Sequence, residues 1–299
     1  MTRLTAFFSL FSVAVLAAGA VCAEDTLERI ARTGTITIGH RQGELPFSYV
    51  SDGEVTGYST EICLNVIERM RRTLGLGPID IAFTPVTTAT RFIMIGTGKI
   101  DLECAATTNT AERRKLAEFS HPHFVTATRF VSRRVDGLAT IADLTGRSVV
   151  STTGTINVEQ LNALNRERKL NISVILSRSH QEAFDMVSSG RVSAFVMDDI
   201  LLAGLIASSP DPSAYVISRE ALSEPEPYGI LMPPGDYAFK TAFNREMRAL
   251  FESGEIREIY DRWFTQPMPP DGRNMNMPLA SEMKEVLAAV LKDDGVEER

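Results

Sequence analysis

Apolar and polar positions alternate along the chain in a way that predicts short strands and amphipathic helices in turn. β-Branched and apolar segments predict three strands, at 35–39, 79–85 and 100–103. Apolar residues at helical spacing predict helices at 59–72 and 88–96 between these strands. Strands that alternate with helices form βαβ units with a parallel sheet. The first part of the chain therefore predicts an α/β unit.

The same alternation returns after an extended run at 124–131 and a charged connection at 133–137. Helices are expected to follow three further predicted strands, 148–150, 172–176 and 193–196. The two series share no residue-level repeat, but their similar size indicates two lobes. A second extended run at 225–234 and several more helices complete the chain.

Polar residues cluster after each predicted strand of the first series, at 40–42, 87–91 and 106–109. Ligands in parallel α/β sheets bind beyond the carboxyl ends of the strands. In the second cluster, threonine hydroxyls can cap a helix, and Arg91 falls in its first turn, where a cation is unfavourable without a nearby anion. These features predict a carboxylate or phosphate site. Pairing of Arg91 with a surface acid is the alternative.

The first 23 residues predict a cleaved secretory signal peptide. Arg3 supplies the positive start, 4–21 is largely apolar, and small residues stand at the cleavage position. A membrane anchor is the alternative, but the segment is short and an acidic pair follows it. A lipid anchor at Cys22 is disfavoured because Val21 precedes it, where a small residue is usual. We therefore predict a periplasmic protein.

Composition narrows the classes of partner. The chain has 299 residues and a net charge of −7, which argues against nucleic acid as the main partner. The four histidines lack helical metal-ligand spacing, and no P-loop or nucleophile elbow is present, so we expect no metal and no cofactor. Cys63 and Cys104 remain after signal cleavage. An exported pair can form a disulfide, but buried free thiols fit their apolar surroundings equally well.

Seven short segments carry a resemblance that spans nearly the whole mature chain. They are GHR (39–41), PFSY (46–49), GYS (57–59), ECAATTN (103–109), FSH (119–121), MDDILLAG (197–204) and NMNM (274–277). With these segments the chain resembles the periplasmic amino-acid-binding proteins of ABC transporters, bacterial solute-binding protein family 3. Within that family it is most similar to the glutamate/aspartate binders.

The resemblance implies the two-lobed periplasmic binding protein fold of type II, an α/β fold with the ligand cleft between the lobes. By analogy, lobe 1 comprises 27–131 and 233–299, and lobe 2 comprises 132–232. Two crossover strands, around 124–131 and 228–232, would join the lobes. Such lobes close over their ligand.

The resemblance also implies roles for particular residues. Arg91 and Thr108 would hold the α-carboxylate of an amino acid, and Asp198 its α-ammonium group. Arg41 and His180 match residues that bind the side-chain carboxylate in the acidic-amino-acid binders. A buried dicarboxylate needs two separate positive partners, so Arg41, in addition to Arg91, suggests an acidic side chain. Asp198 could instead cap the following helix, and His180 could be an ordinary residue of an early helical turn.

Four further positions complete the implied site. Thr88 stands where the acidic-amino-acid binders have Ser, and Thr155 matches a Thr of the lobe-2 turn. Ala106 replaces a Ser of these binders, so one hydroxyl is missing, and Ile156 replaces a Thr. A water can substitute for the lost hydroxyl. The change could also indicate another ligand, such as a larger anionic amino acid.

The expected function is capture of glutamate or aspartate and delivery to an inner-membrane ABC permease with its ATPase, by a monomer without enzymatic turnover. One alternative is an exported dehydratase or lyase on the same scaffold, since fold does not fix function. Glu103 or His180 would then act as general acid or base. A chemosensory ligand binder is the other alternative.

Overall fold

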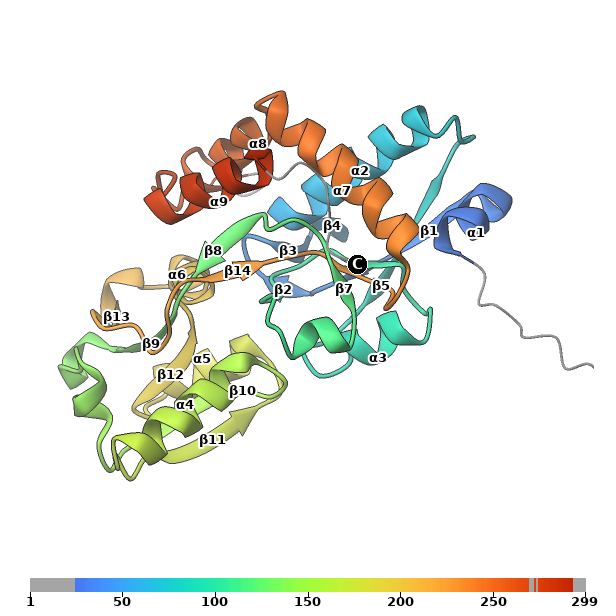
Figure 1. Cartoon of the computed structure of the whole chain (residues 1–299). Helices are drawn as coiled ribbons and strands as arrows, with labels where there is room; N and C mark the ends of the chain where they lie inside the picture. The colour runs from blue at the N-terminus through green and yellow to red at the C-terminus, as the bar shows by residue number, and fades with distance from the viewer. Residues whose placement is uncertain (1–24, 269–271, 273, 293–299) are drawn as a thin grey trace, which may run out of the picture.

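Two lobes, each built on a five-stranded sheet with helices packed around it, make up the molecule (Figure 1). This computed structural model describes residues 25–268, 272 and 274–292, so the predicted signal peptide at 1–23 lies outside the described residues. The architecture confirms the predicted α/β fold with two lobes. None of the helices in the described part of the chain is long and apolar enough to cross a bilayer.

The first sheet has the strand order β5-β1-β6-β15-β7. Its parallel strands are β1 (Thr35–His40), β5 (Asp80–Pro85) and β6 (Leu102–Glu103), and its antiparallel strands are β7 (Glu118–Phe119) and β15 (Leu231–Met232). A small antiparallel sheet beside it contains β2 (Gly43–Glu44), β3 (Ser48–Ser51) and β4 (Glu54–Thr56). The helices of this lobe are α1 (Thr26–Thr33), α2 (Tyr58–Thr73), α3 (Arg91–Gly96), α7 (Tyr237–Glu252), α8 (Glu255–Phe264) and α9 (Ser281–Lys292).

The second sheet has the strand order β11-β10-β12-β9-β13. Its parallel strands are β10 (Ser148–Thr152), β11 (Ser173–Ser177) and β12 (Ala194–Asp198), and the antiparallel ones are β9 (Thr128–Arg133) and β13 (Tyr215–Ile217). The helices of this lobe are α4 (Ile156–Glu167), α5 (His180–Ser188) and α6 (Asp199–Ser208).

The chain passes between the sheets twice, through β8 (Phe124–Thr126) and β14 (Glu226–Tyr228), which pair with each other (Figure 1). The extended run expected at 124–131 is present as two strands, β8 and β9, which have different partners and separate at Ala127. The run at 225–234 likewise divides into β14 and β15. The exact division into lobes at 131/132 and 232/233 stays a prediction.

An aromatic cluster anchors both crossing strands in the first lobe. The rings of Phe124 and Tyr228 stack 5.9 Å apart, and Phe47 lies 4.9 Å from Phe124. Phe264 of α8 stacks on Phe124 at 5.1 Å. Such contacts stabilise each pair by about 0.5–1.5 kcal/mol beyond the burial of apolar area. The cluster therefore packs both crossing strands against the first lobe.

Two local expectations are resolved by the structure. Cys63 on α2 and Cys104 after β6 form a disulfide, so the free-thiol alternative is wrong. Closing a loop across a sequence separation of 41 residues stabilises the fold by about 4 kcal/mol in the chain-entropy model. The helix expected at 88–96 begins only at Arg91, because Thr87 and Thr90 exchange side-chain-to-backbone hydrogen bonds in a preceding turn.

Candidate functional site

Six loops converge between the two sheets, and each follows the carboxyl end of a parallel strand. In the first lobe, β1, β5 and β6 lead into the loops that carry Arg41, Arg91 and Thr108. In the second, β10, β11 and β12 end just before Thr155, just before His180 and at Asp198. The sequence-based placement of the polar clusters at this edge is therefore confirmed.

The loops surround a small cavity of about 10 Å³ between the lobes. Seven of the eight predicted site residues line it: Thr88, Arg91, Ala106, Thr108, Thr155, His180 and Asp198. Arg41 is the exception: it does not line the cavity, and its guanidinium lies 3.1 Å from the carboxylate of Glu44, which does. The remaining lining residues are Glu44, Arg113, Ile156, Asn157 and Met197.

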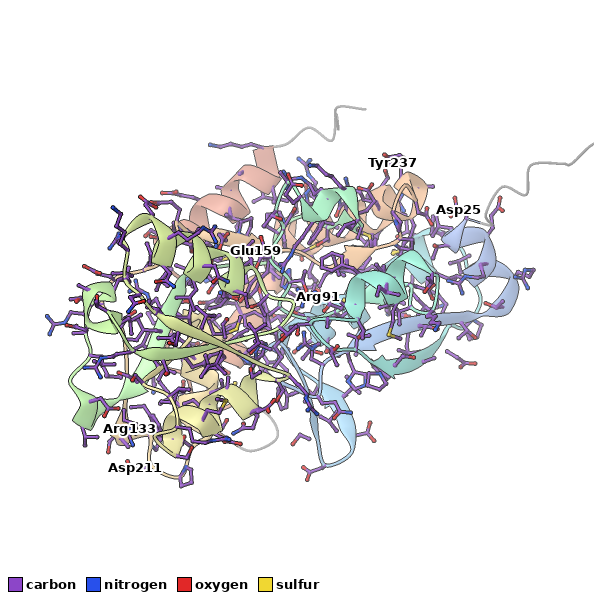
Figure 2. The ribbon with its side chains drawn as sticks, turned by 90° about the horizontal axis from the view of Figure 1, so that it is seen from below. Asp25, Arg91, Arg133, Glu159, Asp211 and Tyr237 are labelled. Atoms are coloured by element: carbon purple, nitrogen blue, oxygen red, sulfur yellow. A yellow bond between two sulfur atoms is a disulfide. The ribbon has the colours of Figure 1, made fainter. Side chains whose placement is uncertain are left out.

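One buried and one half-buried guanidinium group of the first lobe line the cavity. Arg91 lies in the middle of the molecule (Figure 2) and is only 2% exposed. Its Nε has no hydrogen-bond partner, and its Nη2 donates to the Gly154 carbonyl at 3.4 Å. Burial lowers the pKa of Arg91 to about 10, so it remains a cation at neutral pH. Arg113 donates to the Thr108 carbonyl at 3.0 Å, and burial lowers its pKa as well. This part of the cavity suits a carboxylate.

A buried carboxylate of the second lobe also lines the cavity. Asp198 accepts hydrogen bonds from Asn157 Nδ2 at 2.7 Å and from the Tyr228 hydroxyl. Burial raises the pKa of Asp198, and these two hydrogen bonds only partly oppose that rise. Asp198 occupies the residue before α6 but makes no capping hydrogen bond, so the capping alternative is not observed. A cationic group in the cavity would give this carboxylate a charged partner.

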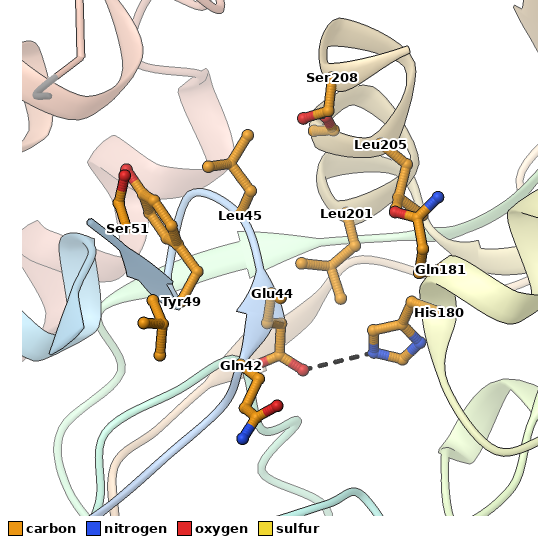
Figure 3. A pocket seen from close by; sticks show the side chains of 13 residues that line it. Gln42, Glu44, Leu45, Tyr49, Ser51, His180, Gln181, Leu201, Leu205 and Ser208 are labelled. Atoms are coloured by element: carbon orange, nitrogen blue, oxygen red, sulfur yellow. Dashed lines mark hydrogen bonds and ion pairs between the residues drawn. The ribbon is translucent and has the colours of Figure 1, made fainter. Parts of the chain in front are cut away.

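A third group of residues lies at the side of the cavity next to Arg41. Glu44 is 2% exposed and accepts a hydrogen bond from the Ala106 N–H at 2.9 Å. Its carboxylate lies 3.1 Å from Arg41 Nη1 and 3.4 Å from His180 Nε2 (Figure 3). Burial alone would raise the pKa of Glu44, but Arg41 and His180 together hold it below its usual range. Glu44 is therefore ionised.

His180 begins α5, but it is more than an ordinary first-turn residue. Its ring is 4% exposed, Nδ1 shares a hydrogen bond with Thr152 Oγ1 at 2.9 Å, and Nε2 faces Glu44. The helix is capped by the neighbouring Ser179, whose side chain accepts from the Glu182 N–H. The His180 side chain is thus directed into the region between the lobes.

The lobes touch each other across the cavity. Thr88 Oγ1 donates to the Thr153 carbonyl at 2.6 Å, so one predicted site residue bridges the two sheets. Gly154 has φ of +82°, and a Cβ there would lie 2.8 Å from the Thr88 carbonyl oxygen. Thr155 donates its hydroxyl to the Thr152 carbonyl, within its own turn. The structure therefore represents a closed arrangement of the lobes.

Sequence reasoning missed several residues of the cavity. Arg113 falls in a charged run that is typical of an exposed surface, and no local signal distinguishes it. Asn157 reads as an ordinary residue of the first turn of α4, yet its amide links Asp198 to Thr128 Oγ1. Glu44 carried one signal, an acid three residues after a predicted arginine ligand. Among the described residues, no cluster of His, Cys, Asp and Glu could hold a metal ion.

Comparisons with known proteins identify the family of the chain. Residues 36–266 match the family model of bacterial extracellular solute-binding proteins, family 3. The L-glutamate/L-aspartate-binding protein of Pseudomonas aeruginosa is 39% identical, over 94% of this chain and 95% of that protein. The glutamate/aspartate import solute-binding protein of Escherichia coli is 36% identical, over 89% and 88%.

A solved structure supports the fold as well. An ancestral arginine-binding protein bound to arginine is 25% identical and superimposes with a TM-score of 0.68, covering 77% of this chain and 98% of that one. The region that matches the family model, residues 36–266, contains nearly all of both sheets and every predicted site residue. The chain belongs to family 3 of the bacterial extracellular solute-binding proteins, the substrate-binding components of ABC transporters.

Proposed function

We propose that this protein is exported to the periplasm, captures an acidic amino acid between its lobes and delivers it to an inner-membrane ABC permease with its ATPase. The observation that carries the proposal is the placement of Arg91 and Asp198 on opposite lobes around one cavity. An α-amino acid is a zwitterion, and it offers a carboxylate to the first and an ammonium group to the second. Neither lobe alone holds both partners.

Hydrogen-bond donors line the part of the cavity that would hold the ligand's α-carboxylate. The unpartnered Arg91 Nε and the nearby Arg113 supply charge-assisted hydrogen bonds, which are stronger than neutral ones. Thr88, Thr108 and Thr155 surround the same space. On the other lobe, an ammonium group would stabilise the ionised form of Asp198, which burial otherwise disfavours.

Glutamate and aspartate are the proposed ligands for two reasons. The relatives with 36–39% identity carry glutamate and aspartate in their names. Arg41 and His180 lie at the side of the cavity, where they supply cationic or hydrogen-bonding partners for a second carboxylate.

The enzyme alternative finds little support in the position of Glu103. This carboxyl is fully buried under the cavity, accepts a hydrogen bond from Thr107 at 2.7 Å, and is absent from the residues that line the cavity. A general acid or base must reach the reacting atom of the substrate. We therefore propose reversible binding without turnover.

A thermal-shift screen of the twenty amino acids and common dicarboxylic acids tests the proposal. Ligand at 100 times its dissociation constant stabilises the native state by about 2.7 kcal/mol. We expect glutamate or aspartate to raise the melting temperature, and the same compounds to leave an Arg91→Ala variant unchanged. If none of the amino acids shifts the wild-type melting temperature, the proposal is wrong.

A further inference from the structure

The carboxylate of Glu44 already occupies the position that the acidic ligand's side chain would take. It lies 3.1 Å from Arg41 Nη1 and 3.4 Å from His180 Nε2, the two groups predicted to bind a side-chain carboxylate. It also accepts from the Ala106 N–H at 2.9 Å. All three partners of this subsite therefore contact a carboxylate that belongs to the protein itself.

Moving the Glu44 side chain out of this position costs free energy, because its three partners stabilise the ionised form. Burial without partners would favour the protonated acid, whereas here the pKa is below its usual range. A second carboxylate beside it would meet a like charge in a buried space, and two carboxylates that share one site cannot both ionise freely. A ligand carboxylate must therefore share a proton with Glu44 or displace it.

The surroundings give Glu44 a place to move. Glu44 and His180 line both the cavity between Arg91 and Asp198 and a wider pocket of about 220 Å³ on their other side. Tyr49, Leu201 and Leu205 are among the residues of this wider pocket (Figure 3). Rotation of the Glu44 side chain towards that pocket would free Arg41 for a ligand.

We infer that Glu44 is a specificity-determining residue, a resident carboxylate that competes with the side-chain carboxylate of the ligand at Arg41 and His180. The inference rests on the proposed function, because it assumes an amino acid held by Arg91 and Asp198. Glutamate and aspartate bind only by competing with Glu44. Glutamine and asparagine leave Glu44 in place, since their side-chain amide N–H groups can donate to it. The ligands of this cleft therefore include the amides as well as the acids.

Titration calorimetry with glutamate, aspartate, glutamine and asparagine tests this inference. The proteins are wild type, Glu44→Gln and Glu44→Ser, with Glu54→Gln as a control in the same small sheet, where Glu54 is exposed. The measured quantity is the ratio of acid affinity to amide affinity. We expect both Glu44 variants to raise this ratio by about tenfold or more, because the competing charge is gone. The control should keep the wild-type ratio.

The outcomes separate the inference from the proposed function. A ratio that rises less than about threefold over the control, or falls, overturns the role of Glu44 while amino-acid binding stands. If no protein binds any of the four ligands, the proposed function fails and the inference fails with it. Should both variants fail to fold, the wild type decides. Glutamine bound within about tenfold of glutamate supports competition by Glu44, and a larger preference for glutamate overturns it.

Discussion

Thr88 Oγ1 on the first lobe donates a hydrogen bond to the Thr153 carbonyl on the second, at 2.6 Å. This contact lies beside the cavity and joins loops that are 65 residues apart in the sequence. The next residue, Gly154, accepts from Arg91 Nη2, so the same turn approaches a predicted ligand-binding side chain. One turn of the second lobe therefore contacts both Thr88 and Arg91 of the first.

Gly154 should be required for closure of the lobes. Its φ is +82°, and a methyl group there would lie 2.8 Å from the Thr88 carbonyl oxygen of the other lobe. We expect Gly154→Ala to weaken amino-acid binding by about tenfold or more, because the lobes cannot meet. Gly146→Ala is the matched control, since Gly146 has φ of +70° in the same lobe and open space around it. Both variants lose about 1–2 kcal/mol of stability from the left-handed backbone.

The two variants are compared by titration calorimetry and urea unfolding. Equal ligand affinity in Gly154→Ala and Gly146→Ala would mean that the tight contact at Thr88 plays no part in binding.

Arg91 should contribute to the binding of every α-amino acid, whatever its side chain. Removal of its guanidinium leaves the ligand α-carboxylate in a closed cleft with Arg113 as the remaining cation. We expect Arg91→Ala to weaken glutamate, aspartate, glutamine and asparagine by about 2–5 kcal/mol each. Arg72→Ala, on the exposed end of α2, serves as the control and should keep wild-type affinity. A loss confined to the acidic ligands would place Arg91 at the side-chain carboxylate instead.

The strands and helices that position the site were predictable from sequence because their signals are local. The apolar runs before Arg41, Arg91 and Thr108 indicate parallel strands, and the polar residues after them must share one edge. The order of strands in each sheet and the pairing of β8 with β14 depend on contacts over long sequence separations. The disulfide between Cys63 and Cys104 likewise depends on a contact between residues far apart in the sequence. The sequence alone is equally compatible with two buried free thiols.

The site itself was predictable only in part. Seven of eight predicted residues line the cavity, because the resemblance carried their positions. Arg41 differs, since its charge is matched by Glu44 from the adjacent small sheet, and local sequence does not show that this carboxylate turns toward the arginine. Arg113 reaches the cavity from a short 3-10 turn, and no periodicity marks which arginine of such a run turns inward.

Asp198 should strengthen ligand binding and, in the ligand-free protein, lower the free energy of unfolding at neutral pH. Burial raises its pKa, so ionisation costs more in the folded protein than in the unfolded chain. That cost appears as pH rises from about 3.9, the ordinary pKa, through the folded value. We therefore expect ligand-free Asp198→Asn to unfold at pH 7 with a free energy equal to or above that of wild type.

The same Asp198→Asn variant should bind glutamate about 2–5 kcal/mol more weakly, because the α-ammonium group loses its charged partner. Its affinity for glutarate, which lacks that ammonium group and is repelled by the Asp198 carboxylate, should not decrease. Calorimetry with both compounds and urea unfolding of the ligand-free protein check these outcomes. Wild-type affinity for glutamate in the variant would exclude Asp198 as the ammonium ligand.

His123 should make the stability of the protein depend on pH at values above those at which carboxylates ordinarily titrate. It is fully buried, shares a hydrogen bond with Ser59 Oγ at 2.9 Å, and burial lowers its pKa to about 3. The neutral ring is favoured in the folded state, whereas the unfolded chain binds a proton below about pH 6.5. Stability is therefore complete above pH 6.5 and falls as pH decreases towards 3, by up to about 1.4 kcal/mol per pH unit.

Urea unfolding at pH 7, 6 and 5 for wild type and His123→Gln isolates this effect. The wild type should lose stability between pH 6 and 5 more steeply than the variant. Parallel pH dependences would show that His123 does not stay neutral in the folded protein.

The central claim is that one amino acid joins the lobes through Arg91 on one side and Asp198 on the other. Small-angle X-ray scattering tests it most directly, with calorimetry to establish saturation. We predict that saturating glutamate decreases the radius of gyration of the ligand-free wild type, and that glutarate, which cannot engage Asp198, produces less closure. A radius that does not change at full saturation with glutamate would contradict the account.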